Sequence, residues 1–205
     1  MTGGYSGIGY ELARILYQKN GIVYVAGRSS SKGTEAISNI KNACPESTGR
    51  LEFLQLDLSD LSTIKASAEE FLSREERLDV LTNNAGIATP PAGSVDAQGH
   101  ELQLGTNCLG HFLFTSLLLP LLEKTAAASV SGTSRVTWAG SVTSELFAPK
   151  GGVAFDKDGE PITSSNQKIN YGQSKAGDIF IASEFARRFG ERGIISVVCL
   201  RPWLV

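Results

Sequence analysis

The chain has 205 residues, of which 41% are hydrophobic and 20% are charged, and its formal net charge is -2. This length and composition predict a single globular domain over residues 1–205, without linkers or repeats. The small negative charge gives no electrostatic basis for binding nucleic acid or an anionic membrane surface. Residues 109–122 are the most apolar stretch, but they are too short to span a bilayer, so we expect a buried core or interface helix there.

The chain opens with the glycine-rich segment TGGYSGIG at residues 2–9. Apolar residues then recur at helical spacing over residues 10–17, which predicts a helix directly after the glycines. Glycine lets a backbone approach a pyrophosphate closely, and the start of a helix supplies free amide donors. The segment therefore indicates a dinucleotide phosphate site, and an ordinary glycine-rich turn is the alternative.

From residue 21 onward, predicted strands and helices alternate. Strands are expected at residues 22–26, 51–56, 79–82, 135–139 and 194–199, and helices at 34–42, 61–72, 111–122 and 176–188. Strands that are connected through helices are parallel, so the pattern predicts an α/β fold with a doubly wound parallel sheet and helices on both faces. Ligands of such folds bind at the carboxyl ends of the strands.

Tyr171 and Lys175 form a pair near the end of the chain. Residues four apart share one face of a helix, so the ammonium group can lie close to the phenol and stabilise its phenolate form. The pair is therefore an acid/base device. Alone it is a weak signal, because ordinary residue usage would produce it by accident in roughly one such chain in five.

Several independent motifs, in the same order along the chain, resemble the short-chain dehydrogenase/reductase family over nearly the whole length. They are the glycine segment, Asp57, the NNAG turn at residues 83–86, Asn107, Ser141, and Tyr171 with Lys175. The segment NCLGHFLFT at residues 107–115 looks most like the branch that contains the retinol dehydrogenases. The resemblance implies a Rossmann-like fold and an oxidoreductase that moves hydride between a nicotinamide cofactor and a carbonyl or alcohol substrate.

The resemblance also implies four catalytic residues. Tyr171 would donate a proton to the developing alkoxide, and Lys175 would hold the nicotinamide ribose hydroxyls. Ser141 would hydrogen-bond the substrate oxygen, and a plain turn former at the end of a strand is its alternative. Asn107 would hold the long helix open at a kink where water relays protons to Lys175.

Arg28 decides the predicted cofactor. No acidic residue stands between the predicted strand at 22–26 and Glu35, and a guanidinium beside serines fits a 2′-phosphate, so NADP(H) is favoured over NAD(H). Solvated loop charge is the alternative for Arg28. Asp57 resembles the family residue at the adenine edge, and a helix N-cap is the alternative. Asn84 resembles the family residue in the turn beside the adenosine ribose, and a plain structural turn is the alternative. The implied cofactor-binding set is Gly3, Gly7, Ile8, Gly9, Arg28, Asp57, Asn84, Tyr171, Lys175 and Val205.

Other features predict supporting roles. Cys44, Cys108 and Cys199 are odd in number and widely spaced, which favours reduced core thiols in the cytosol over disulfides, and no metal site is predicted. His111 lies in an apolar helix, where a structural role is expected. The polar residues 142–170 are expected to form part of the substrate mouth. The resemblance further implies a homodimer through the helix at 111–122 and the helix after Tyr171.

Two departures from the family concern the ends of the chain. The family carries an apolar strand before the glycine segment, between the strands expected here at 22–26 and 79–82, whereas Met1 stands directly before Thr2. The segment RPWLV at 201–205 resembles the family's nicotinamide-contacting segment, with Trp203 where glycine is usual, and the family continues beyond it. We therefore expect a chain truncated at both ends. A catalytically silent protein that binds a nucleotide or a partner is the alternative function.

Overall fold

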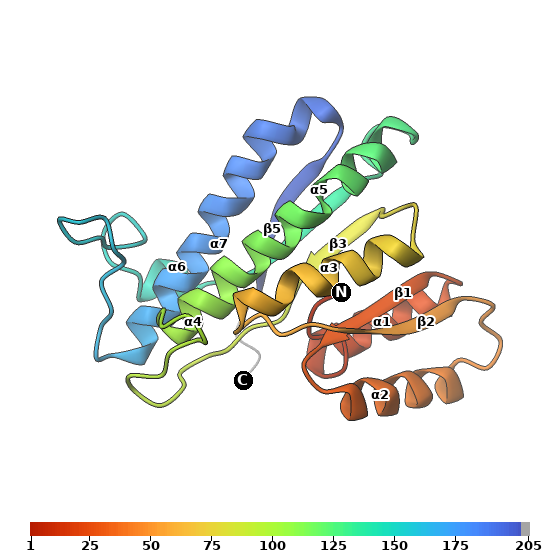
Figure 1. Ribbon diagram of the computed structural model, residues 1–205, viewed down its shortest axis with the longest axis horizontal. Helices are drawn as coiled ribbons and strands as arrows, with labels where there is room; N and C mark the ends of the chain where they lie inside the picture. Colours follow the sequence, from red (N-terminus) through yellow and green to blue (C-terminus); the bar gives the residue numbers. More distant parts are fainter. Residues whose placement is uncertain (202–205) are drawn as a thin grey trace.

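The computed structural model describes residues 1–201 of an α/β protein (Figure 1). Its strands are β1 (Ile22–Gly27), β2 (Arg50–Gln55), β3 (Val80–Asn83), β4 (Arg135–Ser141) and β5 (Ile195–Arg201). Its helices are α1 (Gly7–Gln18), α2 (Ser30–Ala43), α3 (Leu61–Arg74), α4 (Leu102–Leu104), α5 (His111–Ala127), α6 (Thr143–Leu146) and α7 (Gln167–Phe189), with a π-helix η1 (Gly105–Gly110) and a 3-10 helix η2 (Gly190–Arg192). Val205, expected in the cofactor site, lies outside the described residues.

The predicted strands are confirmed, with boundaries shifted by one or two residues. Helices α3 and α5 begin at the predicted residues, whereas α1, α2 and α7 begin earlier than the apolar pattern indicates, and polar side chains cap α2 and α7. The side chain of Ser29 accepts a hydrogen bond from the backbone of Lys32 at the start of α2, and that of Asn166 accepts one from Lys168 at the start of α7. The earlier start places both Tyr171 and Lys175 inside α7.

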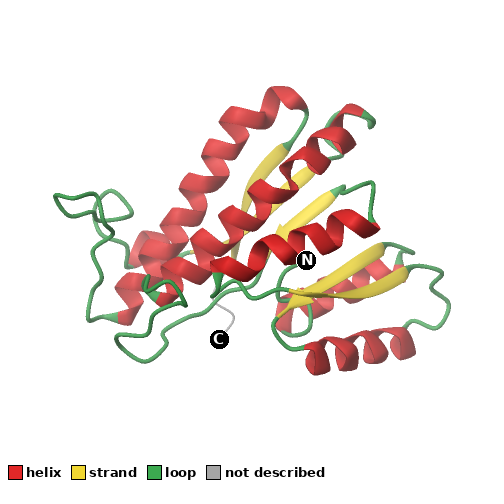
Figure 2. Cartoon of the chain, viewed as in Figure 1, coloured by secondary structure: helices red, strands yellow, loops and turns green. Residues whose placement is uncertain are grey.

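All strand pairs are parallel, as predicted, but the strands form two sheets and not one (Figure 2). β1 pairs with β2, and β3, β4 and β5 form the second sheet. Met1 and Thr2 lie between β1 and β3. The Thr2 amide donates to the carbonyl of Thr82 at 3.0 Å, the Gly3 amide to Ala26 at 2.8 Å, and the Ala26 amide to Met1 at 2.9 Å. The doubly wound parallel fold is therefore confirmed, and the position between β1 and β3, where the family has its first strand, is bridged by Met1, Thr2 and Gly3.

Helices cover both faces, as predicted. Helices α3, α5 and α7 lie over one face of the strands (Figure 1) and enclose the main core, which includes Leu54, Leu122 and Trp138. Helices α1 and α2 cover the other face of β1 and β2 with a smaller core around Val25 and Ile40. The carboxyl ends of both sheets meet at Thr2.

The most apolar helix is longer than the sequence indicates. α4, η1 and α5 form one helical run, Leu102–Ala127, of 26 residues, which is long and apolar enough by length and composition to cross a membrane. The argument that this stretch is too short for a span is therefore wrong. Inside the protein, 56% of its most apolar window is buried together with the polar His111 and Thr115, as in a core helix.

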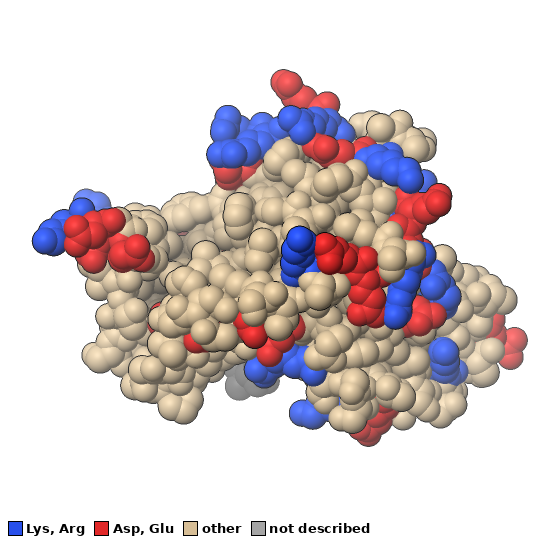
Figure 3. All heavy atoms as spheres, viewed as in Figure 1, with Lys and Arg blue, Asp and Glu red and all other residues tan. Residues whose placement is uncertain are grey.

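The surface charges and two of the three cysteine thiols agree with the predictions made from composition, and Cys199 is the exception. Acidic and basic side chains are interspersed on the face shown in Figure 3. Cys44 and Cys108 are buried free thiols, but Cys199 is exposed, so the core prediction is wrong for Cys199. Cys199 shares a face of β5 with Val197, itself 40% exposed. Within residues 1–201 no cluster of three or more His, Cys, Asp or Glu could hold a metal ion.

Candidate cofactor and active site

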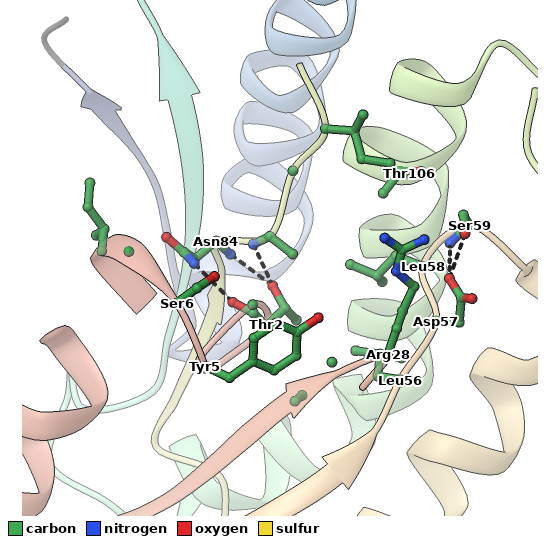
Figure 4. A pocket seen from close by; sticks show the side chains of 18 residues that line it. Thr2, Tyr5, Ser6, Arg28, Leu56, Asp57, Leu58, Ser59, Asn84 and Thr106 are labelled. Atoms are coloured by element: carbon green, nitrogen blue, oxygen red, sulfur yellow. Dashed lines mark hydrogen bonds between the residues drawn. The ribbon is translucent and has the colours of Figure 1, made fainter. Parts of the chain in front are cut away.

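The carboxyl ends of β1, β2 and β3 surround a cavity of about 270 Å³ (Figure 4). The glycine segment forms one wall, and the residues that follow the three strands form the others. The lining residues that the sequence predicted are Gly3, Gly7, Ile8, Arg28, Asp57 and Asn84. The cavity therefore lies where a doubly wound fold binds its ligand.

The glycine segment is shaped for a close approach of a ligand. Gly3 and Gly7 have φ angles of +62° and +53°, which strain other residues. No atom lies within 4 Å of where a Cβ on Gly7 would stand, whereas a Cβ on Gly9 would lie 2.4 Å from the Gly3 carbonyl oxygen. Gly7 thus faces open space, and Gly9 lets α1 pack against the loop.

The start of α1 carries unused amide donors. Ser6 occupies the N-cap without a side-chain hydrogen bond to the helix, and the first intrahelical bond reaches it from Tyr10 at 3.2 Å. The amides of Gly7, Ile8 and Gly9 accordingly have no intrahelical partner. A helix start of this kind is suited to an anionic phosphate group.

Arg28 and Tyr5 both line the cavity, Arg28 beside Leu58 and Tyr5 beside Thr2 and Ser6 (Figure 4). Arg28 is exposed, and its backbone carbonyl accepts a hydrogen bond from Gln55 Nε2 at 2.9 Å. The Tyr5 ring lies against Gly27, where a Cβ would come within 2.2 Å of it. Tyr5 was not predicted as a site residue, because nothing in its spacing distinguishes it from a loop residue.

Asp57 also lines the cavity. Its Oδ1 accepts hydrogen bonds from the Ser59 amide at 2.9 Å and the Ser59 hydroxyl at 2.6 Å. Asp60 is the N-cap of α3 and accepts from the Ser62 amide. The alternative reading of Asp57 as the N-cap is therefore wrong.

The Thr2 hydroxyl joins the glycine segment to the turn after β3 and to the long helix. It accepts hydrogen bonds from the amides of Asn84 and Ala85, each at 2.9 Å, and lies 2.9 Å from His111 Nε2. His111 Nδ1 lies 2.9 Å from the Asn107 carbonyl, which can only accept, so Nδ1 is protonated and Nε2 accepts from Thr2. Burial lowers the pKa of His111 to about 4. The structural role predicted for His111 is confirmed, but the part played by Thr2 was missed.

Asn107 lies in the π-helical segment η1, where the helix is locally widened. Its Nδ2 donates to the Ile87 carbonyl at 3.0 Å and to Ser174 Oγ at 2.9 Å, and its Oδ1 accepts from the Ile87 amide at 2.9 Å. The predicted irregularity of the long helix is thus observed. Asn107 ties the turn after β3 to α7.

Lys175 and Tyr171 lie close together on α7. Lys175 Nζ is 5.8 Å from the centroid of the Tyr171 ring and donates to the Ala139 carbonyl at 2.7 Å. A Cβ on Gly86 would lie 3.3 Å from Asn107 Oδ1 and 3.8 Å from Lys175 Nζ. Lys175 therefore stands beside Gly86, a residue of the cavity wall.

Ser141 ends β4 in a buried position, with 7% of its surface exposed. Its Oγ accepts hydrogen bonds from the Thr143 hydroxyl at 2.8 Å and the Thr143 amide at 3.2 Å, so its own proton remains available. Helix α6 approaches α7 closely, since a Cβ on Gly172 would lie 2.9 Å from the Thr143 carbonyl oxygen. Because Gly172 directly follows Tyr171, this contact brings the segment after Ser141 close to Tyr171.

Six of the predicted residues line the cavity. Among the described residues, five others are predicted site residues but are not part of its lining: Gly9, which packs against the Gly3 carbonyl, Asn107, Ser141, Tyr171 and Lys175. Tyr171 and Lys175 lie with Asn107 beyond Gly86, and Ser141 is connected to α7 through Thr143, whose carbonyl lies beside Gly172. The segment 142–170 contributes to a separate cavity of about 350 Å³ through Val153 and residues 160–163.

Comparison with known proteins supports the same interpretation. A family model for short chain dehydrogenase matches residues 1–146. The short-chain dehydrogenase/reductase pkfC of Emericella nidulans is 48% identical over 199 residues, 96% of this chain and 63% of that protein. The short-chain dehydrogenase/reductase iacJ of Pestalotiopsis fici is 45% identical over 204 residues, 98% of this chain and 62% of that protein.

A solved structure is also similar. The Pseudomonas aeruginosa RhlG/NADP active-site complex matches with a TM-score of 0.73 and 26% identity, covering 96% of this chain and 68% of that one. The present chain spans less than two thirds of the length of the two fungal relatives.

Proposed function

The chain belongs to the short-chain dehydrogenase family, and from this premise we propose that it is an NADP-dependent oxidoreductase acting on a carbonyl or alcohol substrate. The observation that carries the proposal is the position of Lys175, with Tyr171 one turn before it on α7, beside Gly86 at the wall of the glycine-lined cavity. An acid/base pair thus adjoins a site suited to a dinucleotide.

The residues of the cavity fit NADP. The amides at the start of α1 suit the pyrophosphate, and Gly7 leaves open space in front of them. Arg28 offers a planar fork of donors that suits a 2′-phosphate, and no acidic side chain among the cavity residues other than Asp57 opposes it. RhlG, 26% identical, was solved in complex with NADP. When bound, the nicotinamide supplies or accepts the hydride.

The residues beyond Gly86 would handle the proton. Tyr171 would donate it to the alkoxide that develops on the carbonyl oxygen, and Ser141, whose own proton is available, would hydrogen-bond that oxygen. The positive charge of Lys175 near the Tyr171 ring favours the phenolate that remains. Asn107 would support this geometry by holding α7 against the turn after β3.

Replacement of Tyr171 tests the acid/base role. Tyr171→Phe should lower turnover by a factor of about 100 or more while NADPH affinity changes little, because only the proton donor is lost. Tyr10→Phe, in α1, is the matched control and should leave turnover unchanged. Unaltered turnover of Tyr171→Phe on any accepted substrate would sink the assignment.

Replacement of Arg28 tests the cofactor. Arg28→Asp should raise the dissociation constant of NADPH far more than that of NADH, because a like charge then faces the 2′-phosphate. Lys32→Asp, on α2 and away from the cavity lining, makes the same charge change as a control. Fluorescence titration with both cofactors measures the result, and equal effects on the two would mean that Arg28 is loop surface.

A second candidate is nucleotide or partner binding without turnover. The interrupted pairing between β1 and β3 favours it, because catalysis needs groups held in fixed relative positions. NADPH that raises the melting temperature without being oxidised by a panel of aldehydes and ketones would support this candidate. Oxidation that depends on Tyr171 would exclude it.

A homodimer in the cytosol forms part of the proposal. Phe112 on α5 and Phe180 on α7 are 47% and 50% exposed, which makes these two helices suitable for an apolar contact between two copies. Sedimentation at micromolar concentration tests the contact. A monomer alone would count against it.

A further inference from the structure

Lys175 is held in a buried ion pair that the proposed reaction does not require. Its Nζ donates to Asp178 Oδ2 at 3.0 Å and to the Ala139 carbonyl at 2.7 Å, and the two charged side chains are only 5% and 3% exposed. An ammonium group has three donors, so this protein itself uses two of them. One donor remains for Tyr171 or a cofactor hydroxyl.

Asp178 is incompletely satisfied in this position. Its Oδ1 is buried without a hydrogen-bond partner among the described residues. The groups that act on it are Lys175 on its own helix and the Cys108 thiol from η1, while Tyr171 acts on Lys175 and Glu101, at the N-cap of α4, acts on the Cys108 thiol. Leaving one oxygen of a buried carboxylate unpaired is unfavourable, so the position calls for a compensating function.

Lys175 and Asp178 each stabilise the charged form of the other. Burial alone would lower the pKa of Lys175, but Asp178 and Tyr171 raise it. Burial raises the pKa of Asp178 to about 6, although Lys175 opposes this. Above pH 7 the pair is therefore ionised, and the negative charge of Asp178 offsets part of the positive field that Lys175 exerts on the phenol 5.8 Å away.

We propose that Asp178 is a positioning residue that sets the acidity of Tyr171 through Lys175, by fixing the ammonium group toward Ala139 and by weakening its field at the phenol. The inference rests on the proposed function of Tyr171. An aspartate three residues after the lysine shares its helix face, so this role could have been sought in the sequence. With the charge of Asp178 removed, Lys175 should favour the phenolate more strongly.

Absorbance titration of the phenolate near 295 nm, between pH 7 and 10.5, tests the inference without turnover. Each variant is measured with and without Tyr171→Phe, so that the difference isolates Tyr171 from the other tyrosines. Asp178→Asn keeps the shape of the side chain and should move the Tyr171 transition to lower pH by about one unit. Glu184→Gln makes the same charge change on an exposed part of α7 and should not move it.

A double-variant cycle tests the route through Lys175. In a Lys175→Met background Asp178→Asn should have a much smaller effect on the Tyr171 transition, because burial without the neighbouring ammonium group favours the neutral carboxyl of Asp178, which exerts no net charge on the phenol. No shift in Asp178→Asn alone, or an equal shift in both backgrounds, would overturn the inference. The pH profile of turnover should move in the same direction. If Tyr171→Phe leaves turnover intact, the proposed function fails while the titration result still stands.

Discussion

The seam between β1 and β3 is built differently at its two ends. At the carboxyl end, backbone bonds of Met1, Thr2 and Gly3 join both strands, and the Thr2 hydroxyl ties them to the long helix. At the amino end the two strands border a cavity of about 330 Å³. Ile22 and Val80, which line it, are 61% and 45% exposed.

This difference indicates what the candidate site requires of the sheet. The cofactor cavity and the acid/base cluster both lie at the carboxyl ends of the strands, where the seam is closed. Ile22 and Val80, at the open end, belong to neither group, although Ala26 lines both the cofactor cavity and the cavity at the open end. The local geometry of the site therefore depends on Thr2, while the stability of the whole molecule depends on what lies in the rest of the seam.

Filling the open end should have the largest effect. Six apolar residues added before Met1 should raise the unfolding free energy by about 5 kcal/mol, since buried side chains contribute about 1.5–3 kcal/mol each and ordering costs about 1–2 kcal/mol per residue. Urea unfolding measures the gain in unfolding free energy.

A polypeptide of residues 1–205 should also aggregate more readily than the extended one in size-exclusion chromatography, because unpaired strand edges pair with foreign strands.

The control for this extension is a segment of the same length with alternating Lys and Glu, which cannot be buried in an apolar cavity. It should give no stabilisation. An apolar extension that performs no better than the charged one would show that the seam accepts no strand. A cooperative thermal transition of the unextended monomer, raised by NADPH, would show that the closed end suffices.

Removing the Thr2 hydroxyl should break the closed end. Thr2→Val keeps the shape but leaves the amides of Asn84 and Ala85 and the His111 Nε2 without their partner. We expect a loss of about 3 kcal/mol in unfolding free energy, since each buried unpaired group costs about 1–3 kcal/mol and partial relaxation recovers some of it. Thr82→Val, on the same seam, should cost less than about 1 kcal/mol. Equal losses of unfolding free energy in the two variants would mean that the Thr2 hydroxyl contributes no more than the Thr82 side chain.

Acidification should weaken the same end through His111. Its folded pKa of about 4 lies below the ordinary value of 6.5, so the unfolded chain binds the proton first as the pH falls. Stability should be complete above pH 6.5 and decrease by about 2 kcal/mol between pH 6.5 and 5. Urea unfolding at several pH values should show this slope in the wild type and in His100→Gln. The slope should be reduced in His111→Gln, and an unreduced slope would assign it to other groups.

The sequence predicted the fold well where the signal is local. Apolar runs such as 22–26 and 135–139 are strands in the structure, and the glycines of TGGYSGIG form the expected loop before α1. The division between β1 and β3 agrees with the position at which the family strand is missing, but the way Met1, Thr2 and Gly3 bridge it was not predicted, because it depends on contacts between segments far apart in the sequence. The length of the helical run Leu102–Ala127 was underestimated because Thr106, Asn107 and His111 interrupt its apolar pattern.

The candidate site was predicted where family motifs name a residue and missed where side chains act through space. Tyr171, Lys175 and Asn107 do lie together, and Asp57 faces the cavity. Tyr5 was missed because its contact with Gly27 forms only on folding, whereas Asp178 was overlooked although its spacing from Lys175 places it on the same helix face. A spacing rule identifies residues on one helix face, but it does not tell which buried charges compensate each other.

The smallest expected effect concerns the side chains at the open end. Glu75, which lines the open cavity, accepts a hydrogen bond from the Tyr24 hydroxyl at 2.7 Å and pairs with Arg50. Because its side chain is only 15% exposed, Glu75→Gln should lower the unfolding free energy by about 1 kcal/mol. Glu52→Gln is the matched control: Glu52 lies 3.7 Å from Arg50 with its side chain 38% exposed, and should lose less than about 0.5 kcal/mol. Urea unfolding of both variants, at low and at high salt, measures the two losses of unfolding free energy. A loss no larger for Glu75 than for Glu52 would mean that side chains do not hold the open end, which would then depend on the core beneath α3 alone.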